Sequence, residues 1–282
     1  MRAAGKLACS MKRIQLRSVL VILFAALAML HFIGFSQERH GIGAPQADRL
    51  TVVEDALVSI FENSTLEIQY GFIKDIGDGN GFTAGRAGFT SKTGDMLEVL
   101  QEYEKLRPGS MLAKYIEPLQ SVLHTASTGP IAGLVSDWPL ATGRDPLFRK
   151  AQDLVNERLY RIPAKAMAQS LGLQLPLSRA AIYEAGIQHG YGDDHDSVNQ
   201  IVARTNHAVG GTPRGGVDEV KWLGAFIDMR EQDLRDPANK EYGPIFLDAV
   251  DRAQAIRKIF REENYDLAKP ITVTVYGDTF TF

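Results

Sequence analysis

Residues 61–95 read FENSTLEIQYGFIKDIGDGNGFTAGRAGFTSKTGD, and they determine the architecture that we expect for the chain. Just before them, residues 46–62 carry apolar side chains at helical spacing, at Leu50, Val53, Leu57, Ile60 and Phe61. Between residues 71 and 90, glycines separate short apolar and β-branched runs, a pattern typical of a small antiparallel sheet with tight turns. The stretch therefore predicts a helix that leads directly into a small sheet.

Helical spacing returns after the sheet and continues almost to the C-terminus. It predicts helices within residues 96–106, 111–124, 145–171, 177–189, 196–207, 218–234 and 246–262, with Pro118 and Pro163 bending or ending two of them. Trp138-Pro139 and residues 210–216 are predicted to be loops, and residues 271–282 a strand or extended segment. The expected fold class is α+β, mostly helical, with one small antiparallel sheet near the N-terminus.

The composition excludes several classes of protein. Of 282 residues, 45% are hydrophobic and 23% are charged, which excludes a disordered tail, a collagen-like fibre and a coiled coil. The single cysteine excludes an intrachain disulfide framework and a zinc site built on cysteine pairs. Five basic and no acidic residues precede Val19, and without these five charges the formal charge of −3 becomes −8. Such an acidic body argues against nucleic-acid binding and is compatible with a cationic partner.

The N-terminus has the layout of an export signal. Residues 1–17 form a basic n-region, and residues 18–35 read SVLVILFAALAMLHFIGF. We expect residues 18–36 to be a signal peptide or a retained membrane anchor, because an apolar run of this length lies on the border between the two. Residues 37–45 would then be a linker to a folded body at residues 46–282.

Two carboxylates in the first stretch are candidates for catalysis. Glu62 stands at the predicted end of the helix, and Asp78 stands between two glycines in the predicted sheet. Glycoside hydrolysis uses such a pair, one carboxylic acid to protonate the departing oxygen and one carboxylate to activate water or attack carbon. Thr83 follows Asp78 on the next strand, where a hydroxyl can orient water. From these residues alone, solvated surface carboxylates are the commoner interpretation.

The stretch resembles the catalytic region of the chitosanases of glycoside hydrolase family 46. The resemblance rests on Glu62-Asn63-Ser64, Tyr70, Ile76-Gly77-Asp78-Gly79, Gly81-Phe82-Thr83, Gly85, Gly88-Phe89 and residues 93–97. It continues at residues 106–109, 112–115, 183, 189–190, 203–205 and 226–230, and so covers nearly the whole chain after residue 50. It implies a two-lobed, lysozyme-like fold with a cleft between the lobes. It also implies an inverting hydrolase that cuts β-1,4-linked glucosamine chains without a metal or another cofactor.

Carried over by position, the resemblance implies a role for each of six residues. Glu62 resembles the general acid, Asp78 the general base, and Thr83 the residue that holds the attacking water. Three further residues resemble substrate-binding residues of the family: Ser64, Tyr70 and Asp95. Asp95 also opens a predicted helix after a glycine, so N-capping explains it equally well.

The resemblance also implies a buried ion-pair network behind the acid. Arg230 resembles the arginine beside the acid, and Arg204 and Glu184 resemble the rest of the network. Glu184 stands where the family usually has Asp, and Asn80 stands where it usually has Arg, two residues after the base. The second departure puts a charge contact beside Asp78 in doubt.

Two other clusters are set aside. Residues 189–196, HGYGDDHD, are rich in potential metal ligands. His195 and Asp193, however, have no second pair of ligand residues at a metal-site spacing, so a solvated loop is the simpler interpretation. Residues 210–216, GGTPRGG, lack the spacing of a phosphate-binding loop.

The resemblance, together with the export pattern, therefore implies an extracellular or periplasmic endo-chitosanase that acts as a monomer on a cationic polysaccharide. No nucleic-acid partner is expected. Contact with a membrane is expected only through residues 18–36, and only if this segment is not cleaved. Two alternatives stay open: a lysozyme-like peptidoglycan hydrolase, which shares a helix-borne Glu beside a small sheet, and a non-catalytic periplasmic polysaccharide-binding protein.

Overall fold

The computed structural model describes residues 46–240 and 243–282. The predicted basic n-region, the signal or anchor segment and the linker, residues 1–45, lie outside the described residues. Among the described helices, none combines the length and the apolar character that crossing a membrane requires.

The predicted helix and sheet form where the sequence places them. Helix α2 (Gln46–Asn63) is followed by β1 (Ile73–Asp75), β2 (Phe82–Ala84) and β3 (Phe89–Thr90). The strands pair antiparallel in the order β1-β2-β3, with Thr83 opposite Lys74 on one side and opposite Thr90 on the other. Glycines at positive φ lie in the connections, so the chain reverses within a few residues.

Helices make up most of the remaining described chain, as predicted. They are α3 (Asp95–Leu106), α4 (Ile116–Ser121), α5 (Leu134–Arg144), α6 (Pro146–Asn156), α7 (Ile162–Leu171), α8 (Pro176–His189), α9 (Val198–Val209), α10 (Glu219–Arg235), α11 (Gly243–Asp248) and α12 (Val250–Arg261). A π-helical turn, Glu157–Arg161, connects α6 to α7, and short 3-10 turns lie at Ala113–Tyr115, Gly129–Ile131 and Pro213–Gly215. The C-terminal segment is a hairpin of β4 (Thr272–Val275) and β5 (Asp278–Thr281).

One predicted loop is wrong: Trp138 and Pro139 lie inside helix α5. Trp138 is fully buried, its ring packs edge-on against Phe148 at 4.8 Å, and its Nε1 donates to the carbonyl of Tyr70 at 2.8 Å. Burial of so large a side chain outweighs the backbone hydrogen bond that proline removes.

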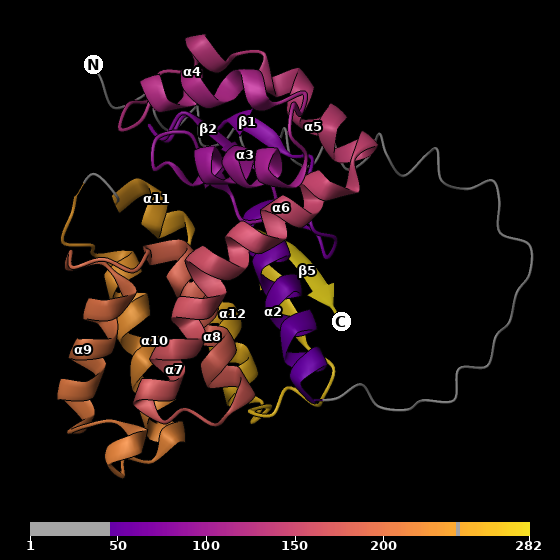
Figure 1. Ribbon diagram of the computed structural model, residues 1–282. Coiled ribbons are helices and arrows are strands. Elements are labelled where there is room, and N and C mark those ends of the chain that lie inside the picture. The colour runs from indigo at the N-terminus through magenta and orange to yellow at the C-terminus, as the bar shows by residue number, and fades with distance from the viewer. Residues whose placement is uncertain (1–45, 241–242) are drawn as a thin grey trace, which may run out of the picture. The chain divides into compact units, whose positions relative to one another are not determined.

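The buried apolar side chains form two large clusters, and these define two lobes (Figure 1). The cluster of the sheet lobe comes from the β1-β2-β3 sheet and α3 to α6. That of the helical lobe comes from α2, α7 to α10, α12 and the C-terminal hairpin. Helix α2 therefore carries Glu62 on the helical lobe, while Asp78 belongs to the sheet lobe.

Candidate active site

Glu62 lies in the last turn of α2 with its side chain 22% exposed. The neighbouring Ile60 and Phe61 are buried in the core of the helical lobe, which fixes the orientation of this turn. The helix ends at Asn63, and the next residue, Ser64, adopts a left-handed φ of 52° while its N–H donates to the Ile60 carbonyl at 2.9 Å. The carboxylate is thus held at the end of a packed helix and stays accessible to water.

One oxygen of Glu62 is bound to an arginine that the sequence analysis did not identify. Arg252 Nη1 donates to Glu62 Oε1 at 2.8 Å, and the guanidinium lies over the Phe61 ring, 5.3 Å from its centroid. Arg252 belongs to α12 and lies 190 residues further along the chain. A signal did exist, because Arg252 stands between Ala249 and Ile256 at helical spacing, on an otherwise apolar stripe.

The other oxygen of Glu62 faces the sheet. A Cβ on Gly88 would lie 3.0 Å from Glu62 Oε2 and 3.5 Å from the methyl group of Thr83. The hydroxyl of Thr83 is buried and has no hydrogen-bond partner among the described residues. The fold therefore brings Glu62, Thr83 and the glycine turn after β2 into one small region.

Asp78 lies in the loop between β1 and β2, partly exposed. Its Oδ1 accepts the backbone N–H of Asn80 at 3.0 Å, and its Oδ2 accepts the Asn80 side-chain amide at 3.1 Å. Lys92 ties this loop to the chain after β3, because its N–H donates to the Asn80 carbonyl and its Nζ to the Gly79 carbonyl. A neutral amide thus makes the contact beside Asp78 where the resemblance implied an arginine.

A buried ion network stands behind Glu62. Arg252 Nε donates to Glu184 Oε1 at 2.7 Å, and Arg230 pairs with the other oxygen of Glu184. All three side chains are at most 4% exposed. Burial alone would raise the pKa of Glu184, but Arg230 and Arg252 together lower it below its ordinary value. Glu184 therefore stays ionised and holds both arginines in place.

The predicted membership of this network is wrong in two places. Arg230 pairs with Glu184, and it is Arg252 that contacts Glu62, because α12 rather than α10 passes over Phe61. Arg204 belongs to a different cluster: its guanidinium pairs with Asp233 and donates to the His195 carbonyl at 2.7 Å.

The three predicted substrate-binding residues differ in their contacts. Tyr70 donates its hydroxyl to Asp153 at 2.8 Å, and its carbonyl accepts from Trp138, Thr142 and Gln152, so it anchors the sheet lobe. Ser64 directly follows the last residue of helix α2.

Asp95 is the first residue of α3, and Gly94 is the N-cap, so the predicted capping position is wrong by one residue. Asp95 Oδ1 accepts from the backbone of Thr90 and Met96 and from the hydroxyl of Thr93, and Oδ2 accepts from Tyr160 at 3.0 Å. Burial raises the pKa of Asp95, and these hydrogen bonds oppose that rise.

The potential metal ligands in the loop of residues 189–196 already have protein partners. His195, Asp196 and Asp233 present ligand atoms within 4.8 Å of one another. Asp196, however, accepts the backbone N–H groups of Ala238 and Asn239 at 2.7 and 2.8 Å, and Arg204 places a positive charge against Asp233. The carboxylates of this cluster thus already receive hydrogen bonds and a positive charge from the protein itself.

Comparison with known proteins identifies similar chains. The model of Glycosyl hydrolase family 46 matches residues 56–271. A chitosanase of Bacillus subtilis (strain 168) is 44% identical over 221 residues, which cover 78% of this chain and 79% of that protein. A chitosanase of Streptomyces sp. (strain N174) is 38% identical over 228 residues, covering 79% of this chain and 78% of that protein.

Solved structures agree with the sequence relatives. The native chitosanase of Bacillus subtilis MY002 superposes with a TM-score of 0.79 at 41% identity, covering 86% of this chain and 100% of that chain. A Gynuella sunshinyii chitosanase in complex with chitotetraose gives a TM-score of 0.79 at 42% identity, covering 83% of this chain and 97% of that chain.

Proposed function

The chain belongs to glycosyl hydrolase family 46 and is a glycoside hydrolase, and from this premise we propose that it is an endo-acting chitosanase. In this proposal it hydrolyses β-1,4 glucosaminide bonds with inversion of the anomeric carbon. Two solved relatives support the substrate class, since one was captured with chitotetraose and another with six GlcN units.

The observation that carries the proposal is the environment of Glu62. Arg252 engages one carboxyl oxygen at 2.8 Å, while the other faces Gly88 and Thr83 across the boundary between the two lobes. A carboxylic acid held by one oxygen can present the other to a glycosidic oxygen and donate its proton there. Glu62 is accordingly proposed as the general acid.

Water activation is assigned to the sheet lobe. Asp78 is proposed to accept a proton from water, with Asn80 fixing the orientation of its carboxylate through two hydrogen bonds. The buried hydroxyl of Thr83, without a partner among the described residues, is proposed to hold that water. Ser64 and Asp95 keep their proposed roles in substrate binding. The protein is also proposed to be exported, and the pattern of residues 1–36 alone supports this part of the proposal.

Removing the proton donor or acceptor tests this assignment. Glu62→Gln and Asp78→Asn should each lower the turnover of chitosan oligomers by a factor on the order of 10²–10⁴, because an amide replaces neither an acid nor a base. Glu117→Gln, an exposed glutamate on α4, is the matched control and should retain wild-type turnover.

Three results would contradict the proposal. They are near-normal turnover by Glu62→Gln, a β-configured initial product in an NMR time course, and hydrolysis of peptidoglycan without hydrolysis of chitosan.

A further inference from the structure

Helix α2 touches one short turn of the sheet lobe at two points. The turn is Gly85 to Gly88, between β2 and β3. Asp55 and Glu62 lie seven residues apart on α2, which is about two helical turns, so they share one face. Arg86 Nη2 pairs with Asp55 Oδ1 at 2.7 Å, and Gly88 lies against Glu62 Oε2.

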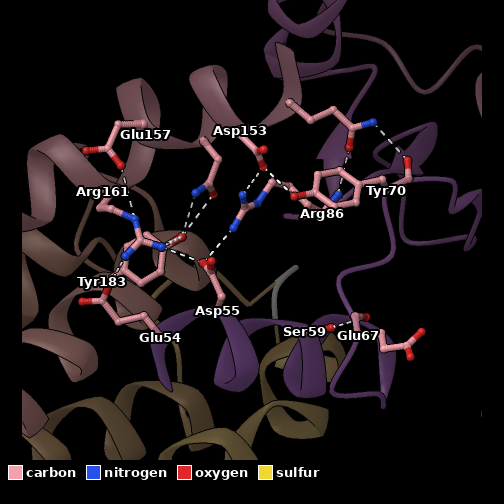
Figure 2. A network of polar contacts seen from close by, with 12 residues as sticks. Glu54, Asp55, Ser59, Glu67, Tyr70, Arg86, Asp153, Glu157, Arg161 and Tyr183 are labelled. Carbon is pink, nitrogen blue, oxygen red and sulfur yellow. Dashed lines mark hydrogen bonds and ion pairs between the residues drawn. The ribbon is translucent and has the colours of Figure 1, made fainter. Parts of the chain in front are cut away.

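Arg86 is anchored on the sheet lobe as well as on α2. Its side chain is 8% exposed, it also pairs with Asp153 of α6, and its guanidinium carbon lies 5.8 Å from the centroid of the Tyr70 ring (Figure 2). Its backbone N–H donates to the side chain of Gln152 at 3.2 Å. A planar guanidinium that binds two carboxylates has little freedom, so this arginine fixes the turn that carries it.

Asp55 is held from the opposite side. Arg161 Nη2 pairs with the same Asp55 oxygen at 2.6 Å, and Arg161 also pairs with Glu54 and Glu157 (Figure 2). The carboxylate that receives Arg86 is thus itself fixed between two arginines.

We infer that the Arg86–Asp55 ion pair positions Glu62 for catalysis by docking the Gly85–Gly88 turn on α2. Both ends of the turn are glycines at positive φ, 70° and 66°, so the turn has little stiffness of its own. With the pair in place, Gly88 lies beside the oxygen of Glu62 that does not bind Arg252. Arg86 and Asp55 are positioning residues, and the inference rests on the proposed role of Glu62.

The test separates positioning from stability. Arg86→Gln and Asp55→Asn should each lower kcat about tenfold or more, since a displacement of about 1 Å at a reacting group costs up to about 100-fold. KM should stay within about twofold, because the pair acts on the reacting group and not on substrate binding. Arg257→Gln is the matched control: Arg257 also pairs with two carboxylates, Asp228 and Glu231, but on the outer face of α10 and α12, and its kcat should be unchanged.

A double mutant tests whether Arg86 affects catalysis through Glu62. If Arg86 acts through Glu62, then Arg86→Gln should lower the residual kcat of Glu62→Gln by less than about twofold, because the group that it positions is already disabled. Independent losses that multiply would overturn the inference. So would an Arg86→Gln enzyme that melts earlier but keeps wild-type kcat.

The remaining outcomes are also decisive. If Arg86→Gln does not fold, Arg86→Lys takes its place, because lysine keeps the charge but cannot bind both carboxylates in a fork. Arg86→Lys should fold and lose kcat. A normal kcat in that variant would overturn the inference. Near-normal turnover by Glu62→Gln would instead overturn the proposed function. Loss of turnover in Glu62→Gln with normal turnover in Arg86→Gln would overturn only the positioning role.

Discussion

At the scale of single residues, Gly88 is the position where backbone conformation and a proposed catalytic carboxylate both favour glycine. Its φ of 66° is the left-handed conformation that glycine adopts without strain, and a Cβ there would lie 3.0 Å from Glu62 Oε2. An alanine here would therefore strain the backbone and displace the Glu62 carboxylate by a few tenths of an ångström. The methyl group of Thr83 would lie 3.5 Å from the same Cβ, in ordinary van der Waals contact.

These two requirements can be separated by experiment. Gly88→Ala and Gly109→Ala should both lose about 1–2 kcal/mol of stability, because Gly109 has a similar φ of 73°. Nothing lies within 4 Å of a Cβ on Gly109, so that variant should keep its turnover, whereas Gly88→Ala should lose about tenfold. Thermal midpoints and kcat measured side by side decide the matter, and equal turnover in the two variants would rule out a role for the Gly88 contact.

At the scale of elements, the end of α8 connects the buried ion network to the loop that follows. His189 Nδ1 donates to the Asp196 carbonyl at 2.9 Å, and its Nε2 accepts from Arg230 Nε at 3.4 Å. Burial, aided by the charge of Arg230, lowers the pKa of His189 to about 3. The ring is therefore neutral under most conditions and accepts from the arginine that pairs with Glu184.

This linkage predicts how stability depends on pH. The ordinary pKa of His189 is 6.5, so below that pH the unfolded chain binds a proton that the folded chain does not bind. The contribution of this ring to the free energy of unfolding is therefore intact above pH 6.5 and is lost as pH falls toward 3, by up to about 1.4 kcal/mol per pH unit.

Urea unfolding at pH 7 and pH 4.5 measures the effect. His189→Gln should lose less stability between these two pH values than the wild type does, and His207→Gln, which changes an exposed histidine of α9, should lose as much as the wild type. Parallel losses in the wild type and His189→Gln would show that this ring does not cause the dependence.

At the scale of the whole molecule, the charge of the body bears on how substrate arrives. Without the five basic charges of the N-terminus the chain carries a formal charge of −8, while chitosan is a polycation. Long-range attraction of this kind raises the rate of encounter and is screened by salt.

The value of kcat/KM for chitosan oligomers should fall by a factor on the order of 10 between about 0.01 and 0.15 M salt. The value of kcat at saturating substrate should change little, because steering affects encounter and not the chemical step. A kcat/KM that is independent of salt would mean that the acidic body has no part in substrate capture.

The local pattern of the sequence determined the helix, the small sheet and the residues that they carry. Glu62, Asp78 and Thr83 all lie within 22 residues, so periodicity and glycine spacing suffice to place them at a helix end, a loop and a strand. The family resemblance added their proposed roles, since a Glu and an Asp in such positions are common on any surface.

Only the tertiary structure decided which arginines serve this site. Arg252 reaches Glu62 across 190 residues, Arg86 reaches Asp55 across 31, and Arg204 turned out to serve another cluster. The burial of Trp138 likewise made a helix of a predicted loop. The physical reason is the same in each case: local spacing reports which face of an element is apolar, whereas the partner of a buried charge or ring depends on which elements pack together.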